Sequence, residues 1–224
     1  MSTATTDIDI EELNRIYQPL NPIQRLRKVF GDFDHEDILV TSSFGTTSGI
    51  LMGMVSKAAP GHPIHFIDTT FCFNKTISYK QTLTMLLGLN IINVLPDIED
   101  NTLARETKMW ESDTDKCCNL NKTKPFEPYK AKKKIWISGL LMNQTPFREN
   151  LNIFERRGDI IKMHPNIDTS ALQFDMFLAD NEIPPHPLKA EGFDSVGCTH
   201  CTLKGKGRSG RWANSDKTEC GIHL

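Results

Sequence analysis

Apolar residues recur along the first two thirds of the chain in two patterns, one with helical spacing and one in short continuous runs. The helical spacing predicts amphipathic helices over 10–17 and 22–30, and the short runs predict buried strands. The predicted strands are 38–40, 64–67, 91–95 and 135–137, and the helices between the first three are 50–57 and 75–87. Strands and helices that alternate at this spacing predict a three-layer α/β fold around a mostly parallel sheet.

The pattern weakens in the last third of the chain. A helix is predicted over 171–180, and it ends before the proline-rich stretch 183–187 because proline cannot continue a helix. From Gly192 onward glycine, cysteine and basic residues dominate, and few apolar side chains are left to bury. We therefore expect one domain, in which residues 1–190 form the α/β core with its N-terminal helices and residues 191–224 form a tail that folds against it.

Small polar residues join the first predicted strand to the helix that follows. The loop contains Ser42, Ser43, Phe44, Gly45, Thr46 and Thr47. A strand, a small polar loop and a helix direct backbone N–H groups and a helix N-terminus at a phosphate. Ligands of parallel sheets bind beyond the carboxyl ends of the strands, where Asp68 also falls at the end of the second strand. The loop residues and Asp68 are therefore candidates for binding a phosphorylated substrate.

The 224 residues carry a net charge of −2 and 38% of them are hydrophobic, so a packed core is expected and a nucleic-acid-coating role is not. No apolar stretch approaches the ~20 residues that span a bilayer, and the polar, acidic start lacks the features of a secretion signal. We expect a cytoplasmic protein with no nucleic-acid or membrane partner. Basic residues cluster over 130–134, which we interpret as a solvated face, and over 204–217, which we interpret as an anion site.

Six cysteines in a chain without signs of secretion indicate thiolate chemistry or metal binding rather than a disulfide framework. Cys117 and Cys118 are adjacent, and Cys198 and Cys201 form a C-x-x-C pair. Two thiolate pairs that meet in space can hold a metal. Adjacent side chains diverge, which suits two corners of a 4Fe–4S cluster better than one tetrahedral ion; zinc and a redox disulfide are the alternatives. Cys72, between two phenylalanines, is interpreted as a buried apolar thiol.

Cys220 differs from the other cysteines because it has no cysteine neighbour and is flanked by Lys217 and His223. Nearby positive charge lowers the pKa of a thiol and increases its thiolate fraction. Cys220 is therefore a candidate nucleophile, and the alternative is an incidental surface cysteine.

The segment Glu-Cys-Gly-Ile-His at 219–223, with Gly-Arg-Trp at 210–212 before it, resembles the C-terminal signature of the assimilatory APS and PAPS reductases. These enzymes reduce adenylyl sulfate (APS) or its 3′-phosphorylated form (PAPS) to sulfite. The paired cysteines match the cluster ligands of the iron–sulfur branch of the family, and the segments 42–45 and 66–69 match its phosphate loop and strand end. The resemblance implies an adenine-nucleotide alpha-hydrolase-like fold, a 4Fe–4S cluster, a mobile C-terminal tail and a homo-oligomer.

The same resemblance implies roles for individual residues. Cys220 matches the nucleophile, which attacks the sulfonate sulfur, expels the nucleotide and becomes S-sulfocysteine; reduced thioredoxin or a glutaredoxin-like donor then releases sulfite. Lys122 matches a lysine that contacts the sulfate and links it electrostatically to the cluster. Arg208 and Arg211 match an arginine pair that holds the phosphosulfate, and His223 matches a tail histidine that reaches the same group. Such cations neutralise the leaving phosphate as the S–O bond breaks.

The chain departs from the family pattern at two places. Leu141 and Met142 replace an arginine pair after the fourth strand, which leaves Arg148 as the nearest cation and as a further candidate for substrate binding. Thr70 replaces a glycine in the turn after Asp68, which predicts a local change of the backbone.

The choice between APS and PAPS stays open at this point. The cysteine set is typical of the APS branch, whereas the loop resembles that of cluster-free PAPS reductases and lacks the carboxylates that would repel a 3′-phosphate. Two other functions are considered. An ATP-pyrophosphatase-type adenylating enzyme would carry an S-G-G-x-D-S loop, which this chain lacks. A non-enzymatic iron–sulfur or zinc module would leave the basic residues before Cys220 unexplained.

Overall fold

A computed structural model describes residues 8–212, 217 and 219–222. Within these residues, six strands form one sheet in the order β3-β2-β1-β4-β6-β5. Neighbouring strands are parallel except β5 and β6, which run antiparallel. The strands are β1 (Ile38–Thr41), β2 (Pro63–Ile67), β3 (Asn90–Val94), β4 (Ile135–Ile137), β5 (Phe154–Arg157) and β6 (Ile160–Met163).

Local sequence signals start several of the helices around the sheet. Asp9 accepts hydrogen bonds from two backbone N–H groups in the first turn of α1, and Asn21 with Gln24 forms a capping box at α2. The α-helices are α1 (Ile10–Tyr17), α2 (Pro22–Asp32), α3 (Ser48–Ala58), α4 (Asn74–Leu87), α5 (Ile98–Glu106), α6 (Met109–Ser112), α7 (Thr114–Cys118), α8 (Lys124–Lys130), α9 (Pro146–Glu149) and α10 (Ala171–Asp180). Short 3₁₀ turns cover His35–Asp37, Met142–Gln144, Pro187–Glu191 and Thr199–Cys201, and a π-helical turn covers Asn119–Thr123. Among the described residues, no helix is long and apolar enough to cross a membrane.

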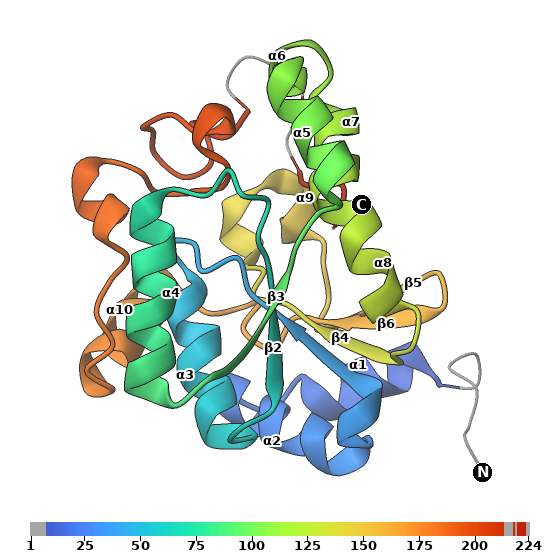
Figure 1. Cartoon of the computed structure of the whole chain (residues 1–224). Coiled ribbons are helices and arrows are strands. Elements are labelled where there is room, and N and C mark those ends of the chain that lie inside the picture. The colour runs from blue at the N-terminus through green and yellow to red at the C-terminus, as the bar shows by residue number, and fades with distance from the viewer. Residues whose placement is uncertain (1–7, 213–216, 218, 223–224) are drawn as a thin grey trace.

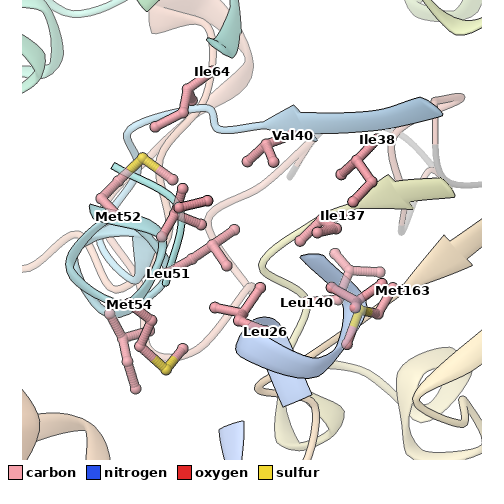
Figure 2. Packing of buried hydrophobic residues seen from close by; sticks show 14 of the residues in the cluster. Leu26, Ile38, Val40, Leu51, Met52, Met54, Ile64, Ile137, Leu140 and Met163 are labelled. Carbon is pink, nitrogen blue, oxygen red and sulfur yellow. The ribbon is translucent and has the colours of Figure 1, made fainter. Parts of the chain in front are cut away.

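Both faces of the sheet are covered by helices. Alternate residues of a strand point to opposite faces, so each strand contributes to two hydrophobic cores. On β1, Ile38 and Val40 belong to the larger hydrophobic core, whereas Leu39 belongs to a smaller one. The larger core packs α2, α3, α4 and α10 against one face, and Figure 2 shows side chains of α2 and α3 meeting those of the strands there. The smaller core packs Phe126 of α8 against Trp136 on the other face. These are the three layers seen in Figure 1.

The predicted fold class is therefore confirmed, and so is the mostly parallel sheet. The predicted strands and helices of the first half correspond to β1 to β4, α1 to α4 and, later in the chain, α10. Strands β5 and β6 and the short helices α5 to α9 were not predicted. The missed helices matter for function, because α7 carries Cys117 and Cys118 and the π-helical turn after it carries Lys122.

The C-terminal segment crosses the end of the molecule at which the parallel strands finish. Figure 1 shows this segment, in orange and red, leaving α10 and running to the end where α5, α6 and α7 lie. An isolated antiparallel bridge joins Cys72, shortly after β2, to Cys198. The hydroxyl of Thr46 donates a hydrogen bond to the carbonyl of Asp194. The division into residues 1–190 and 191–224 stays a prediction, but the two parts are in direct contact.

Candidate active site

A cavity of about 180 Å³ lies where the parallel strands end. Thr41, Ile67 and Ser138, at or directly after the ends of β1, β2 and β4, contribute to its wall. The loop before α3, the π-helical turn, α9 and the C-terminal segment supply other parts of the wall. The candidate residues that line this cavity are Ser42, Ser43, Gly45, Thr46, Thr47, Lys122, Arg148, Arg208, Arg211 and Cys220. The fold thus brings most of the candidates, which lie far apart in the sequence, to one place.

The loop between β1 and α3 is shaped by hydrogen bonds within it. The Ser42 hydroxyl accepts a hydrogen bond from the backbone N–H of Phe44 at 3.1 Å, and the N–H of Ser48 donates to the carbonyl of Gly45 at 3.0 Å. Thr47 precedes α3, but its side chain makes no capping hydrogen bond to the helix. The first turn of α3 can therefore offer main-chain N–H groups, and the positive end of the helix dipole, to an anion in the cavity.

Phe44, predicted to bind substrate, instead belongs to the hydrophobic core. Its backbone has a left-handed φ of 48°, and its side chain is 0% exposed. The ring packs edge-on against Phe66 of β2, with the ring centres 5.7 Å apart. Phe44 therefore holds the loop against the core, and the residues on either side of it line the cavity.

Asp68, also predicted to bind substrate, forms the turn after β2 and is not among the residues that line the cavity. Its carboxylate accepts a hydrogen bond from the N–H of Thr70 at 2.9 Å. Thr70 has a φ of 62°, a left-handed conformation that glycine favours. That conformation costs a non-glycine residue about 1–2 kcal/mol. Arg105 of α5 offsets this cost by donating hydrogen bonds to the hydroxyl and the carbonyl of Thr70.

The wall of the cavity is rich in cations. The cationic side chains that line it are Lys122, Arg148, Arg208 and Arg211. Arg211 donates to the carbonyl of Val196 at 2.9 Å, and its guanidinium lies 4.3 Å from the centre of the Trp212 ring. None of the described residues that line the cavity is Asp or Glu. The cavity is therefore suited to an anion with several negative charges.

The pKa values of these cations reflect their crowding. Burial, and then repulsion from Arg148, lowers the pKa of Arg208 to about 10. Burial also lowers the pKa of Arg211, against the attraction of nearby cysteine thiolates. Burial acts in the same direction on the pKa of Lys122, but the surrounding thiolates outweigh it and hold that pKa above its usual value. These side chains stay protonated at neutral pH, so the positive charge of the wall is maintained.

Cys220 reaches the cavity from the C-terminal segment, with its side chain half-buried. The residue before it, Glu219, is buried and binds Arg148 through two hydrogen bonds of 2.8 and 2.7 Å. Burial raises the pKa of Glu219, but the guanidinium of Arg148 outweighs it and holds that pKa below its usual range. Arg148, predicted to bind substrate, thus directs its guanidinium at the C-terminal segment. His223 lies outside the described residues, and its role stays a prediction.

The four paired cysteines gather beside the cavity. Cys117 and Cys198 are buried in a small hydrophobic cluster with Phe71, and Cys201 packs against this cluster. Burial, and then the neighbouring thiolates, raises the pKa of Cys117 to about 11 and the pKa of Cys201 to about 12. Burial likewise raises the pKa of Cys118. A metal centre bound here would therefore have to displace thiol protons.

All six cysteines lie within the described residues, and none of them forms a disulfide. Cys72, expected to be a buried apolar thiol, is only partly buried and lies next to Cys198 through the backbone bridge. The hydroxyl of Thr69 lies 3.3 Å from the sulfur of Cys198 and 4.0 Å from that of Cys72. Within the described part of the chain, no three His, Cys, Asp or Glu side chains are arranged to hold a single metal ion.

The structure adds Glu219, Trp212 and Lys162 to the candidates. Trp212 lines the cavity and lies against Arg211. Lys162 is 2% exposed on β6 and donates a hydrogen bond to the carbonyl of Ile222 at 3.2 Å. The sequence does carry a signal for Lys162, which is a lysine inside the apolar run 160–163. Glu219 carries no such signal, because it is one of two acidic residues in the basic segment, the other being Asp216.

Comparisons with known proteins agree with one another. The family model described as "Phosphoadenosine phosphosulfate reductase domain" matches residues 37–204. Two curated relatives are named adenosine 5′-phosphosulfate reductase. The relative from Mesorhizobium japonicum is 32% identical over 219 residues, which cover 95% of this chain and 86% of the relative. The relative from Chelativorans sp. is 35% identical over 201 residues, which cover 85% of this chain and 80% of the relative.

Among solved structures, the phosphoadenylyl-sulfate (PAPS) reductase of Candida auris in a phosphate complex matches with a TM-score of 0.74 and 23% identity, over 91% of this chain and 99% of that one. The FMN adenylyltransferase of Candida glabrata, in complex with FMN and an ATP analog, matches with a TM-score of 0.57 and 16% identity, over 92% and 70%. At these identities the two structures show a shared fold. The family match over most of the sequence, together with the two curated relatives, shows that this chain belongs to the phosphoadenosine phosphosulfate reductase family.

Proposed function

We propose that this chain reduces APS or PAPS to sulfite, with Cys220 as the nucleophile and reduced thioredoxin as the electron donor. Family membership supports the reaction class. The observation that carries the proposal is the cavity itself, in which Cys220 meets Lys122, Arg208 and Arg211 beside the loop before α3. We place the reaction in the cytoplasm, where thioredoxin is kept reduced.

The phosphosulfate group of the substrate would lie against the cations of the cavity wall. Arg208 and Arg211 offer planar guanidinium groups that suit phosphate and sulfonate oxygens. The N-terminus of α3 offers main-chain N–H groups to the phosphate on the nucleotide side. Because a thiolate and a phosphosulfate are both negative, Lys122 and the arginines would also reduce the repulsion between them.

The first chemical step forms a bond between the Sγ atom of Cys220 and the sulfonate sulfur. The S–O bond to the phosphate breaks, and its electron pair leaves on the phosphate oxygen of AMP, or of 3′-phosphoadenosine 5′-phosphate when PAPS is the substrate. Lys122, Arg208 and Arg211 stabilise the charge that develops on that oxygen. Removing one donor of this kind typically slows a reaction by about 10²–10³.

The second step releases sulfite. A thioredoxin thiolate attacks Sγ of the S-sulfocysteine, and the bond between the two sulfur atoms of that group breaks, with the electron pair leaving on sulfite. The second thioredoxin thiol then resolves the mixed disulfide and returns Cys220 to its thiolate form. Two electrons pass in total from thioredoxin to the sulfur of the substrate.

We also propose that Cys117, Cys118, Cys198 and Cys201 hold a 4Fe–4S cluster. Four cysteine sulfurs are the usual ligand set of such a cluster, and polar groups lie close to two of them. The side-chain amide of Asn121 is 3.9 Å from the sulfur of Cys117, and the Thr69 hydroxyl is 3.3 Å from that of Cys198. When bound, the cluster would supply a fixed charge next to Lys122.

Two observations bear on the choice between APS and PAPS. The relatives are named for APS, and the paired cysteines are typical of that branch. In contrast, Thr46 and Thr47 line the cavity, and none of the described lining residues is a carboxylate that would repel a 3′-phosphate. The proposal therefore includes both nucleotides.

The experiment that tests the proposal is sulfite release by anaerobically purified protein, with reduced thioredoxin, on APS and PAPS in parallel. Preference for APS would show that the nucleotide specificity follows the cysteine set. Preference for PAPS would show that the loop before α3 sets the specificity. Sulfite release from neither nucleotide would contradict the proposal.

Replacing the nucleophile gives the sharpest control. We expect Cys220→Ser to abolish sulfite release, because a serine hydroxyl is far less nucleophilic toward the sulfonate sulfur than a thiolate. Binding of AMP should be retained, since the loop and the cations are unchanged; calorimetry measures it. Residual turnover at the wild-type rate would mean that another cysteine is the nucleophile.

A further inference from the structure

Glu219 fixes residues 219–222, the last part of the C-terminal segment, on one side of Cys220. Its carboxylate accepts hydrogen bonds from Nε and Nη2 of Arg148, at 2.8 and 2.7 Å, and from the hydroxyl of Thr145 at 2.8 Å. Arg208 approaches the same carboxylate at 3.4 Å. Both partners of the main pair are almost fully buried, with side-chain exposures of 4% for Arg148 and 1% for Glu219. The carboxylate is therefore held by a bidentate, charge-assisted pair in a place that water does not reach.

Lys162 fixes the same segment on the other side of Cys220. Its Nζ atom donates a hydrogen bond to the carbonyl of Ile222 at 3.2 Å and lies 4.4 Å from the centre of the Trp136 ring. The side chain of Ile222 packs against the smaller hydrophobic core, to which Trp136 and Phe126 belong. Lys162 lies on β6, on the face of the sheet opposite to Ile161 and Met163, which belong to the larger core.

We propose that Glu219 and Lys162 are positioning residues that dock this segment at two points and so hold the Sγ atom of Cys220 in the cavity. One anchor lies one residue before Cys220 and the other two residues after it. Neither Glu219 nor Lys162 lines the cavity, so we assign both to positioning Cys220 rather than to binding the substrate. The proposal rests on the proposed function for the reaction that Cys220 performs, but the docking itself is a property of the chain alone.

The physical reason for two anchors lies in the segment itself. Residues 219–222 form neither helix nor strand, so no regular backbone ladder fixes the direction of the Cys220 side chain. A buried ion pair contributes little net stability, because desolvation offsets the attraction, but its hydrogen bonds fix geometry. Thioredoxin must reach the same cysteine later in the cycle, and two local contacts can be released without unfolding the α/β core.

The test uses two variants and one matched control. Glu219→Gln keeps the size of the side chain and removes its charge, and Lys162→Met removes the donor to Ile222. Glu191→Gln is the control, because Glu191 makes an exposed ion pair with Lys75, away from the cavity. If the unpaired charge of Arg148 prevents Glu219→Gln from folding, Lys162→Met still tests the docking.

The first measurement needs no turnover. The rate of alkylation of Cys220 by iodoacetamide is followed by mass spectrometry of its peptide, in protein without nucleotide. We expect alkylation to become at least about tenfold faster in Glu219→Gln and in Lys162→Met, because a released segment exposes the thiol. In Glu191→Gln the rate should stay within about twofold of the wild-type rate, as expected for an exposed pair.

The second measurement separates the two halves of the reaction. Formation of S-sulfocysteine from the preferred nucleotide should slow by at least about tenfold in both variants, because the thiol is no longer aimed at the sulfonate. The affinity for AMP should not fall in either variant, and in Glu219→Gln it should rise slightly, because Arg208 loses a carboxylate partner. Release of sulfite from preformed S-sulfocysteine by thioredoxin should be as fast as in the wild type or faster.

Three outcomes are decisive. Unchanged alkylation together with unchanged S-sulfocysteine formation in both variants would overturn the docking. Loss of AMP binding alongside the first half-reaction would also overturn it, since the substitutions would then be collapsing the cavity. If the wild-type protein formed no S-sulfocysteine from either nucleotide, the proposed function would fail, whereas the alkylation rates would still decide whether Glu219 and Lys162 dock the segment.

Discussion

Arg211 owes its place in the cavity wall to the missing side chain of Gly197. A Cβ atom at Gly197 would lie 2.3 Å from Nη2 of Arg211, and the guanidinium would have to move. Because Arg211 also binds the carbonyl of Val196 and lies against Trp212, there is little room to move without losing these contacts. We expect Gly197→Ala to lower kcat/KM for sulfite release by about tenfold or more, as for loss of a stabilising donor.

Gly31→Ala is the matched control for this substitution, because a Cβ at Gly31 in α2 meets nothing within 4 Å. It should leave kcat/KM unchanged and stabilise the helix by about 0.5–1 kcal/mol. Wild-type kcat/KM in Gly197→Ala would show that the position of Arg211 does not limit the reaction.

Lys162 makes stability depend on pH in a direction that can be worked out. Burial, and then repulsion from Arg157 and Lys130, lowers the pKa of Lys162 from 10.5 to about 7, with smaller effects of Cys220 and Arg148. Between these two values the unfolded chain binds the proton and the folded chain does not. Stability therefore rises with pH in this interval, by about 1.4 kcal/mol per pH unit from this group. Below about pH 7 its contribution is constant.

The measurement is urea unfolding of the wild-type protein and of Lys162→Met at about pH 7 and about pH 9. We expect the stability of the wild type relative to the variant to rise by about 1–3 kcal/mol over this interval. The subtraction removes the effect of cysteines that ionise in both proteins. A difference that does not change with pH would mean that Lys162 keeps its proton in the folded protein.

Individual site residues could be predicted where their neighbours in the sequence indicate their role. The loop Ser42–Thr47 follows an apolar strand, and Cys220 stands among basic residues, so each could be assigned to a role before any contact was known. Glu219 could not be assigned in this way, because its partner Arg148 is 71 residues away in the sequence. The position of Phe44 in the loop could also be predicted, but the left-handed backbone that accompanies its buried ring could not, because local sequence patterns do not show it.

Helices and strands with a clear pattern of apolar residues were predicted, whereas short or highly charged ones were missed. Strand β5 contains three charged residues, Glu155, Arg156 and Arg157, and this composition hid an edge strand that pairs on one side only. The Gly-Asp dipeptide at 158–159 was a sequence signal of a two-residue hairpin turn, and Gly158 has a φ of 60° in the structure. Helices α6 and α7 have four and five residues, which is too short for a helical period to show.

Helices α5 to α7 form a layer whose packing includes the proposed cluster ligands. Cys117 of α7 and Cys198 share a hydrophobic cluster with Ala104 of α5 and Met109 of α6. If iron bridges these cysteines, its removal should loosen this layer, because a covalent link between α7 and the 198–201 turn is lost while the hydrophobic contacts are kept. We expect faster amide hydrogen exchange in 98–118 and 198–201 after anaerobic treatment with a chelator.

Helix α3 serves as the internal reference for this measurement, since it belongs to the larger core. Its exchange rates should not change when iron is removed. Iron and sulfide analysis of the untreated protein decides whether the cluster is present at all. Faster exchange across the whole chain would contradict a local role and would make the cluster a requirement for the fold.

For the whole molecule, the distribution of charge matters more than its sum. The chain carries a net charge of −2, so its overall charge does not attract an anionic substrate; the cations of the cavity must do so locally. Salt should screen this attraction. We expect kcat/KM for the preferred nucleotide to fall by about threefold to tenfold between about 0.05 M and about 0.5 M potassium chloride, mainly through KM.

Alkylation of Cys220 provides a control that does not depend on catalysis. Iodoacetate is an anion and iodoacetamide is neutral, so the cations of the cavity should attract only the first. Salt should therefore slow the reaction of Cys220 with iodoacetate and leave the reaction with iodoacetamide almost unchanged. Equal salt effects on both reagents would show that the cavity does not concentrate anions at the thiol.

Ser42 and Cys220 line one cavity but lie far apart in the sequence. The ribosome therefore synthesises them at different times. A ribosome adds about 5–20 residues per second, so roughly 10–40 seconds separate the synthesis of these two residues. Lys122, Arg148 and Glu219 are all translated before Cys220. The reactive thiol is thus synthesised after the cations and the carboxylate that orient it, and of the anchoring groups only the carbonyl of Ile222 follows it.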